Sequence, residues 1–318
     1  MATSSASQTE VRPHILACIG NTSLVALRHI APKNGARVLL KMESENPTGS
    51  MKDRMALAMI EGAEREGKLG PGGAVVEYTG GSTGVSLSLI CAVKGYPLHI
   101  VTSDAFSKEK LDHMKILGAT LQIIPSDGGK MTGKLTRDMI EAARVVAERT
   151  GAFWTDQFRN QNQASGYHAM AEEIWQQTGG HVDAFVQMVG TSGSIRGTSE
   201  GLRQKNAKVR IVAVEPSESP VLSGGEPGGH KIDGVGAGFI PPLWREGLAD
   251  QIEQVSTDDA IAMALRLARE EGIFGGSSTG GNVVAALRMA EQLGPAATVV
   301  TVMVDSGTKY LKNYGARL

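Results

Sequence analysis

Short apolar runs alternate with amphipathic stretches along almost the whole chain, and this alternation limits the possible fold more than any other feature. The runs are rich in Val, Ile and Leu, which suits strands that are buried on both faces. A chain in which strands and helices alternate forms mainly parallel sheets covered by helices. We therefore predict an α/β protein with strands at 37–42, 74–78, 97–102, 120–125, 183–189, 209–214 and 297–304, and helices at 50–68, 83–94, 108–117, 133–149 and 163–177.

Composition excludes several classes of function. The 318 residues suffice for one large or two modest domains, and 41% hydrophobic with 20% charged residues is typical of a soluble globular protein. A net charge of −1 provides no basic face for nucleic acid, and no apolar run approaches the roughly 20 residues of a membrane span. The histidines lack zinc-binding spacing, so no metal is predicted. Cys18 and Cys91 indicate reduced thiols, and the first residues resemble no signal or transit peptide, which predicts a cytoplasmic protein.

Glycine is the one compositional outlier, with 40 residues, or about one in eight against a usual one in fourteen. Without a collagen-like period, so many glycines indicate tight turns and loops that pack closely on a ligand. Ligands of open parallel sheets bind at the carboxyl ends of the strands. Four loops rich in Gly, Ser or Thr follow predicted strands, at 46–54, 79–84, 190–197 and 305–310.

The first of these loops places Lys52 in the first turn of a predicted helix. The helix dipole is positive there, so the ammonium form is disfavoured. A lysine of that kind is a good imine-forming amine. An exposed lysine on an amphipathic helix remains the alternative for this segment taken alone.

The second and third loops each open a helix with small residues, at Thr79–Gly84 and Gly190–Gly197. Free backbone N–H groups at such a helix start suit a carboxylate or a phosphate, and an ordinary helix cap remains the alternative. The fourth loop brings a hydroxyl to a buried strand end, where it would hydrogen-bond a heterocycle nitrogen; a simple turn is the alternative. The segment 128–135 is similar to a nucleotide-binding P-loop, but Leu135 replaces the hydroxyl residue that binds Mg²⁺, so nucleotide binding is not predicted.

The same loops, together with other segments in matching order, resemble the cysteine synthase (O-acetylserine sulfhydrylase) and cystathionine β-synthase family. Residues 46–54 are similar to its NPxxSxKDR segment, 79–84 to its TSGNTG loop and 190–197 to its GTGGTxxG loop. Further segments that resemble the family are 19–25, 157–158, 213–216, 230–241, 276–280 and 306–311.

The resemblance implies a fold type II pyridoxal-phosphate enzyme, similar to the tryptophan synthase β-subunit, with two three-layer α/β domains. Residues 1–45 and 160–318 would form a large cofactor-binding domain. Residues 46–159 would form a smaller, mobile, substrate-binding domain. The usual assembly of the family implies a homodimer.

The matched positions also imply roles for individual residues. Lys52 would form the Schiff base with pyridoxal 5'-phosphate and act as the general base, and Ser306 would meet the pyridine nitrogen. The residues implied to cradle the phosphate are Gly190, Thr191, Ser192, Gly193 and Ser194. The residues implied to hold the substrate, Ser82 also contacting the cofactor, are Thr79, Gly80, Gly81, Ser82, Thr83 and Gln157.

The implied activity is a β-replacement that makes L-cysteine from O-acetyl-L-serine and sulfide through an aminoacrylate intermediate. The alternatives are a sister reaction, such as cystathionine synthesis or serine deamination, and a pyridoxal-binding protein with a regulatory or partner-binding role. Gly80 and Ser82 depart from the family's TSGNTG loop, while Ser192 and Arg196 depart from its phosphate loop. These departures bear on the identity of the substrate and the nucleophile, and leave Lys52 undisturbed.

Overall fold

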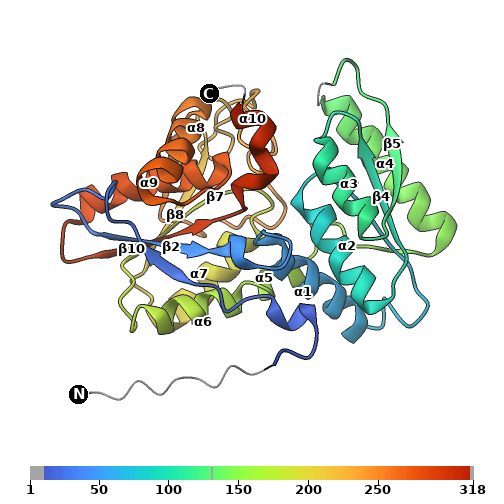
Figure 1. The fold of residues 1–318 in the computed structure, drawn as a ribbon, viewed down its shortest axis with the longest axis horizontal. Coiled ribbons are helices and arrows are strands. Elements are labelled where there is room, and N and C mark those ends of the chain that lie inside the picture. Colours follow the sequence, from blue (N-terminus) through green and yellow to red (C-terminus); the bar gives the residue numbers. More distant parts are fainter. Residues whose placement is uncertain (1–10, 130–131, 316–318) are drawn as a thin grey trace.

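The computed structural model describes residues 11–129 and 132–315, whose strands form two sheets (Figure 1). One sheet has six strands in the order β1-β2-β10-β7-β8-β9, and the other has four in the order β5-β4-β3-β6. All neighbouring strands are parallel except β1 and β2, which confirms the predicted α/β class with mainly parallel sheets. The strands are β1 Leu24–Ala26, β2 Arg37–Met42, β3 Val75–Tyr78, β4 Leu98–Ser103, β5 Thr120–Ile124, β6 Phe153–Trp154, β7 Ala184–Met188, β8 Arg210–Pro216, β9 Gln251–Val255 and β10 Thr298–Met303.

Helices cover both faces of the sheets. In Figure 1, α8 and α9 lie on one face of the six-stranded sheet and α6 and α7 on the other, while α1 and α5 lie between the two halves of the molecule. The α-helices are α1 Lys52–Arg65, α2 Ser82–Lys94, α3 Lys108–Ile116, α4 Gly133–Thr150, α5 Asn162–Ser165, α6 His168–Gln177, α7 Gly193–Lys205, α8 Thr257–Arg266, α9 Ser277–Leu293 and α10 Leu311–Gly315. Single turns of 3₁₀-helix occur at Ile15–Cys18, Glu43–Glu45 and Gly307–Tyr310, and a π-helical turn at Leu267–Glu271.

All seven predicted strands are present, whereas β1, β6 and β9 were not predicted. These three strands lie at sheet edges. An edge strand pairs on one side only and keeps contact with solvent, so it does not need a continuous apolar run. Strand β9, with the sequence QIEQV, is largely half-buried or exposed, in contrast to the fully buried β7. The fourth edge strand, β5, was predicted, because its sequence TLQII keeps enough apolar residues.

The predicted domain boundaries, 1–45 with 160–318 against 46–159, stay a prediction. Each sheet lies within one of these parts, since β3 to β6 all fall between residues 75 and 154. Lys130 and Met131 of the P-loop-like segment, and residues 1–10 of the predicted larger domain, lie outside the described residues. Within the described ranges, no helix is both long and apolar enough to traverse a bilayer.

Helices α8 and α9 cross so closely that a side chain at Gly280 has no space. A Cβ atom there would lie 1.9 Å from the carbonyl oxygen of Ala260 and 2.8 Å from the backbone nitrogen of Ala264. Both atoms belong to the backbone of α8, so neither can move aside as a flexible side chain would.

We predict that Gly280→Ala lowers the free energy of unfolding by about 2 kcal/mol, because α8 must shift away from α9 to accept the methyl group. Urea denaturation followed by circular dichroism measures the change. Gly133→Ala is the matched control, since a Cβ at Gly133 meets only Arg137, at 3.5 Å. Equal stability of the Gly280→Ala protein and the wild type would contradict this account of the helix crossing.

Candidate active site

A cavity of about 990 Å³ opens where strands of both sheets end, lined by residues from both halves of the molecule. The loops that follow β3, β7 and β10 all contribute to its wall, as predicted for the carboxyl ends of parallel strands. Gly193 and Ser306 do not line it. The predicted residues that do are Lys52, Thr79, Gly80, Gly81, Ser82, Thr83, Gln157, Gly190, Thr191, Ser192 and Ser194.

Lys52 is the first residue of α1, where its backbone N–H donates to the hydroxyl of Ser50 at 3.1 Å. Its side chain borders the cavity and keeps some exposure there, while protein atoms surround it closely. Desolvation lowers the pKa of Lys52, although the nearby carboxylate of Asp305 opposes the shift. A larger share of this amine is therefore neutral near pH 7, and only the neutral amine attacks a carbonyl carbon.

The loop between β7 and α7 has the form of an anion site. Ser192, the residue before α7, adopts a left-handed backbone with φ +71°, and its buried hydroxyl has no hydrogen-bond partner within the described structure. Gly190 passes so close to the next loop that a Cβ there would lie 2.4 Å from the carbonyl oxygen of Gly234. The free N–H groups of the α7 start and the unpartnered hydroxyl together suit a phosphate.

Two further hydroxyls of this loop already have protein partners. Thr191 donates to Gln163 at 2.6 Å, and Ser194 exchanges hydrogen bonds with Gln187 at 2.7 and 3.0 Å. Gly193 is the first residue of α7, where a Cβ would lie 2.2 Å from Gln163. The predicted roles of Gly190, Thr191, Ser192, Gly193 and Ser194 stay predictions, and Ser192 has the geometry that fits best.

The loop before α2 forms a second helix start on the opposite wall. Thr83 donates to the side-chain oxygen of Gln157 at 2.9 Å, and Gln157 donates to the carbonyl of Tyr78 at 3.2 Å. Gly80 lies against Phe106, whose ring atoms would be 1.9 Å from a Cβ at that position. The glycine at position 80, where the family carries a hydroxyl residue, is thus accompanied by an aromatic ring that fills the space of a side chain.

The structure places Asp305, rather than Ser306, on the cavity wall. Its carboxylate accepts hydrogen bonds from Ser50 and Ser82 at 2.5 Å and from Tyr310 at 2.8 Å. Burial alone would raise the pKa of Asp305, but the charges of nearby lysines and the hydroxyl donors outweigh burial and hold this pKa at about 2. The carboxylate is therefore charged at neutral pH.

Ser306 has different neighbours. Its hydroxyl pairs with that of Thr308 at 2.8 Å, and its N–H donates to the carbonyl of Gly49 at 2.9 Å. Its predicted contact with a ring nitrogen stays a prediction that no contact in the structure supports. Asp305 was missed because the sequence does not reveal which of two successive residues at a strand end faces the cavity.

Comparison with known proteins decides the class of this site. Residues 15–305 match the family described as pyridoxal-phosphate dependent enzyme. A cysteine synthase of Staphylococcus aureus is 42% identical over 300 residues, which cover 94% of this chain and 95% of that protein. This chain belongs to the pyridoxal-phosphate dependent enzymes.

Solved structures of the family agree with this assignment. A cysteine synthase of Entamoeba histolytica superposes with a TM-score of 0.90 at 35% identity, covering 100% of this chain and 94% of that one. A hydrogen sulfide-producing enzyme of Fusobacterium nucleatum gives a TM-score of 0.88 at 37% identity, with 96% and 99% covered. The family resemblance, the fold type II class and pyridoxal phosphate as the cofactor, all predicted from the sequence, are confirmed.

The residues of the cavity fit this family's cofactor. Pyridoxal phosphate needs an amine to hold its aldehyde carbon and an anion site to hold its phosphate. Lys52, with its lowered pKa, would provide the amine, and the α7 start with the unpartnered hydroxyl of Ser192 would provide the anion site. Both line the same cavity.

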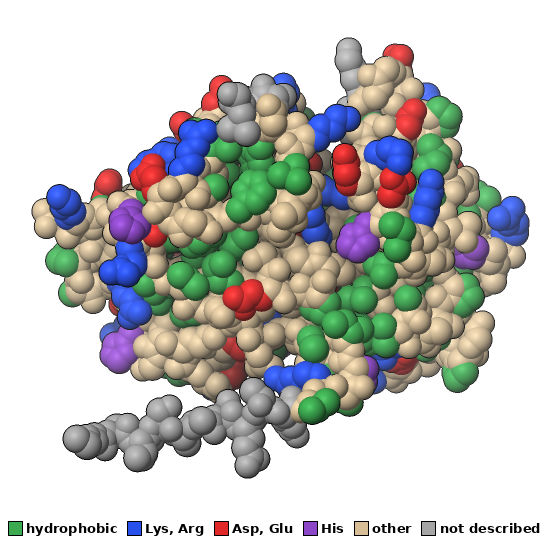
Figure 2. All heavy atoms as spheres, viewed as in Figure 1, with side chains coloured by type: hydrophobic (Ala, Val, Ile, Leu, Met, Phe, Trp, Pro, Cys, Tyr) green, Lys and Arg blue, Asp and Glu red, His purple; other side chains and the backbone are tan. Residues whose placement is uncertain are grey.

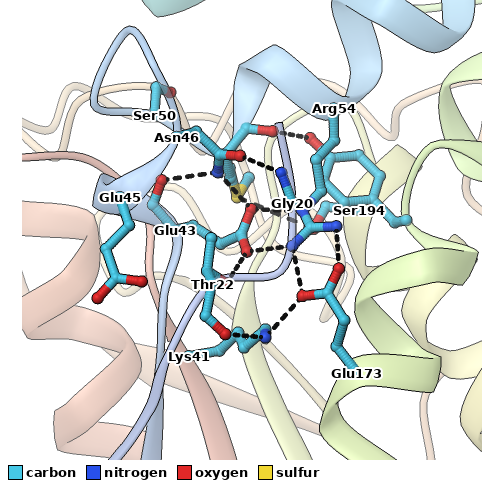
Figure 3. Close-up of polar contacts among 12 residues, drawn as sticks. Gly20, Thr22, Lys41, Glu43, Glu45, Asn46, Ser50, Arg54, Glu173 and Ser194 are labelled. Carbon is cyan, nitrogen blue, oxygen red and sulfur yellow. Dashed lines mark hydrogen bonds and ion pairs between the residues drawn. The ribbon is translucent and has the colours of Figure 1, made fainter. Parts of the chain in front are cut away.

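A buried ionic network supports the start of α1, whose first residue is Lys52 (Figure 3). Arg54 donates to Glu43 through two nitrogens at 2.7 and 2.8 Å, and to both oxygens of Glu173 at 2.8 Å. The fully buried Lys41 adds an ion pair with Glu173 at 2.7 Å. Burial raises and the cationic partners lower the pKa of Glu173, and the partners prevail, holding it at about 2. The network joins β2, α1 and α6.

We predict that Arg54→Met destabilises the protein by about 3 kcal/mol or more, because it leaves Glu43 and Glu173 buried with fewer counter-charges. The folded wild type keeps Glu173 charged down to a pKa of about 2, below the ordinary 4.5, so this stability is present above pH 4.5 and is lost as pH falls toward 2. In the variant this loss between pH 4.5 and 2 should be smaller, because the pKa of Glu173 is then less depressed. Urea denaturation at a series of pH values measures both effects.

Arg144→Met is the control for this prediction. Arg144 also pairs with two glutamates, but its side chain is 46% exposed and those pairs are on the surface of α4. Its replacement should leave the stability unchanged within error at every pH. An equal loss in both variants would show that Arg54 has no special role.

Proposed function

We propose that this enzyme makes L-cysteine and acetate from O-acetyl-L-serine and sulfide. The observation that carries the proposal is that the Lys52 amine, whose pKa is lowered, lies in one cavity with two helix starts. Each of these helix starts suits an anion. The likeness to cysteine synthases over nearly the whole chain supports it. An amino-acid substrate and a sulfur nucleophile are the partners of this reaction.

The two helix starts have separate tasks in this proposal. Gly190, Thr191, Ser192, Gly193 and Ser194 hold the cofactor phosphate at the start of α7. The substrate carboxylate is held at the start of α2 by Thr79, Gly80, Gly81, Ser82 and Thr83. Gln157 orients Thr83 through their hydrogen bond of 2.9 Å. Two anions bound at opposite walls leave the β-carbon of the substrate between them.

Lys52 moves the proton in this scheme. Its Nζ atom, whose pKa is lowered by burial, takes the proton from Cα and returns it after sulfide has added to Cβ. When bound, pyridoxal phosphate supplies the electron sink that accepts the pair left by the Cα–H bond. The acetate leaves Cβ with its bonding electrons. The hydroxyl of Ser82, which donates a hydrogen bond to Asp305, lies on the cavity wall.

A second candidate is a related reaction at the same β-carbon. The solved relatives include an O-ureido-L-serine synthase, with a TM-score of 0.89 at 34% identity, 95% of this chain and 94% of that one being covered. The hydrogen sulfide-producing relative is equally similar. A sister replacement or elimination would use Lys52 and both helix starts in the same way and differ in the leaving group or the nucleophile.

The proposal includes the predicted organisation of the protein. Residues 1–45 with 160–318 form the cofactor domain, and 46–159 form a substrate domain that moves toward it. A homodimer in the cytoplasm completes the proposal, supported by the family resemblance. Light scattering of the purified enzyme measures the subunit number.

We predict that the purified wild type is yellow and that borohydride attaches the cofactor to the peptide containing Lys52, because that amine holds the aldehyde carbon. Lys52→Ala should give no such adduct by peptide mass spectrometry. Lys108→Ala is the control, since Lys108 also lines the cavity but is 82% exposed. A cofactor adduct in the Lys52→Ala protein would refute the assignment of Lys52.

The substrate is tested by adding amino acids one at a time while the absorption of the bound cofactor is recorded. We predict that O-acetyl-L-serine alone shifts the spectrum and that sulfide then restores it with release of cysteine. L-serine alone should leave the absorption spectrum of the bound cofactor nearly unchanged. A shift with L-serine and none with O-acetyl-L-serine would favour the sister reactions.

A further inference from the structure

A fully buried glutamine, Gln163 of α5, connects the two loops that form the anion sites. Its Nε2 donates to the backbone carbonyl of Gln157, and its Oε1 accepts from the hydroxyl of Thr191 at 2.6 Å. Thr191 belongs to the loop before α7, and Gln157 is bonded to Thr83 at the start of α2. Both loops line the cavity, which opens as a hollow between the two halves of the molecule (Figure 2), whereas Gln163 lies behind the cavity wall.

The side-chain amide of Gln163 has one orientation that satisfies both contacts. The carbonyl oxygen of Gln157 only accepts hydrogen bonds, so it must face the NH₂ group of Gln163. The amide oxygen then faces Thr191, whose hydroxyl directs its proton toward Gln163. The free backbone N–H groups of the α7 start and the unpartnered hydroxyl of Ser192 are thus left for the phosphate.

The contacts of Gln157 continue this connection to the substrate loop. Its side-chain oxygen accepts from Thr83 at 2.9 Å, and its side-chain nitrogen donates to the carbonyl of Tyr78 at 3.2 Å. Its backbone N–H donates at 3.0 Å to Glu77, a fully buried carboxylate on β3. Every polar group of Gln157 therefore has a partner, so a shift of its backbone carbonyl also displaces the side chain that holds Thr83.

Close packing at the start of α7 leaves the Gln163 amide little freedom. A Cβ at Gly193 would lie 2.2 Å from its Oε1, so a side chain at position 193 would push the amide away from Thr191. The hydroxyl of Thr191 also accepts from the backbone N–H of Gly193, at 3.4 Å. A buried amide whose two polar atoms are both paired is a rigid connection, because leaving either partner unpaired costs free energy of desolvation.

We propose that Gln163 is a positioning residue that couples the two anion sites. A cofactor phosphate that fixes the loop of Thr191 also fixes Gln157, and Gln157 orients Thr83 toward the substrate carboxylate. This inference rests on the proposed function, in which the phosphate binds at the α7 start and the carboxylate at the α2 start. The amino acid and the cofactor phosphate then bind with positive cooperativity, and each tightens the binding of the other by the same factor.

Binding of L-alanine to enzyme saturated with the cofactor tests the coupling without turnover. L-alanine has the carboxylate but no leaving group on its β-carbon, and the absorption of the bound cofactor gives its dissociation constant. We expect Gln163→Met to raise this constant about tenfold, because the carbonyl of Gln157 loses its donor. Thr191→Val should raise it about fivefold, although position 191 belongs to the phosphate loop. In a Gln163→Met background, Thr191→Val should change it about twofold at most, because the connection is already broken.

The cofactor provides a second measurement. Equilibrium dialysis gives the dissociation constants of pyridoxal 5'-phosphate and of pyridoxal, which has the same aldehyde but no phosphate. We expect Gln163→Met to weaken the binding of pyridoxal phosphate about fivefold and that of pyridoxal about twofold at most, because the variant loosens only the loop that holds the phosphate.

Thr198→Val is the matched control. Thr198 is a fully buried residue of α7, but its hydroxyl has no hydrogen-bond partner among the described residues. This variant should change the dissociation constants of L-alanine and of pyridoxal phosphate about twofold at most.

Two results would overturn the coupling. One is an unchanged L-alanine constant in the Gln163→Met or the Thr191→Val protein, and the other is an equal effect of Thr191→Val with and without Gln163. Circular dichroism shows whether Gln163→Met folds, and if it does not, Thr191→Val alone decides, because it keeps the glutamine and removes one hydrogen bond of 2.6 Å. Failure of the wild type to make cysteine from O-acetyl-L-serine would refute the proposed function separately, because L-alanine binding needs no turnover.

Discussion

The ion pairs of Arg54 are the interaction on which the rest of the site depends. Arg54 follows Lys52 by two residues and is held between Glu43, just after β2, and Glu173 on α6. Charges so deeply buried are tolerated only when their partners are fixed, so the network sets where α1 begins and in which direction it runs. The position of the Lys52 amine relative to both sheets follows from this fixed helix start.

The parts of the site predicted from the sequence are those in which the chemistry is local. A strand that runs into a loop of small residues and then into a helix places free N–H groups at a known point, so both of these loops were predicted, and both line the cavity. The prediction of Lys52 needed evidence from other segments, since a lysine in a first helical turn is common on protein surfaces. The surrounding segments, in family order, distinguished it.

The parts that could not be predicted depend on contacts between distant segments. Lys110 and Tyr310 are 200 positions apart in the sequence, and nothing in either segment indicates that one stacks on the other. Likewise, the choice between Asp305 and Ser306 depends on the path of the chain after β10, where the two residues form isolated bridges with the distant Ser50 and Gly275. The edge strands β1 and β6 escaped prediction because they have only three and two residues, and β9 because polar residues interrupt its apolar pattern.

The contact between Gly80 and Phe106 has a consequence for how this enzyme could have diverged from its relatives. A ring that lies where the first side-chain atom of residue 80 would be makes the two positions interdependent. A hydroxyl residue at position 80 requires a smaller or displaced side chain at 106, and neither change alone gives a well-packed loop. The two substitutions would therefore be inherited as a pair, and the order in which they arose would be constrained to begin at position 80, where the loss of a side chain leaves a gap rather than a clash.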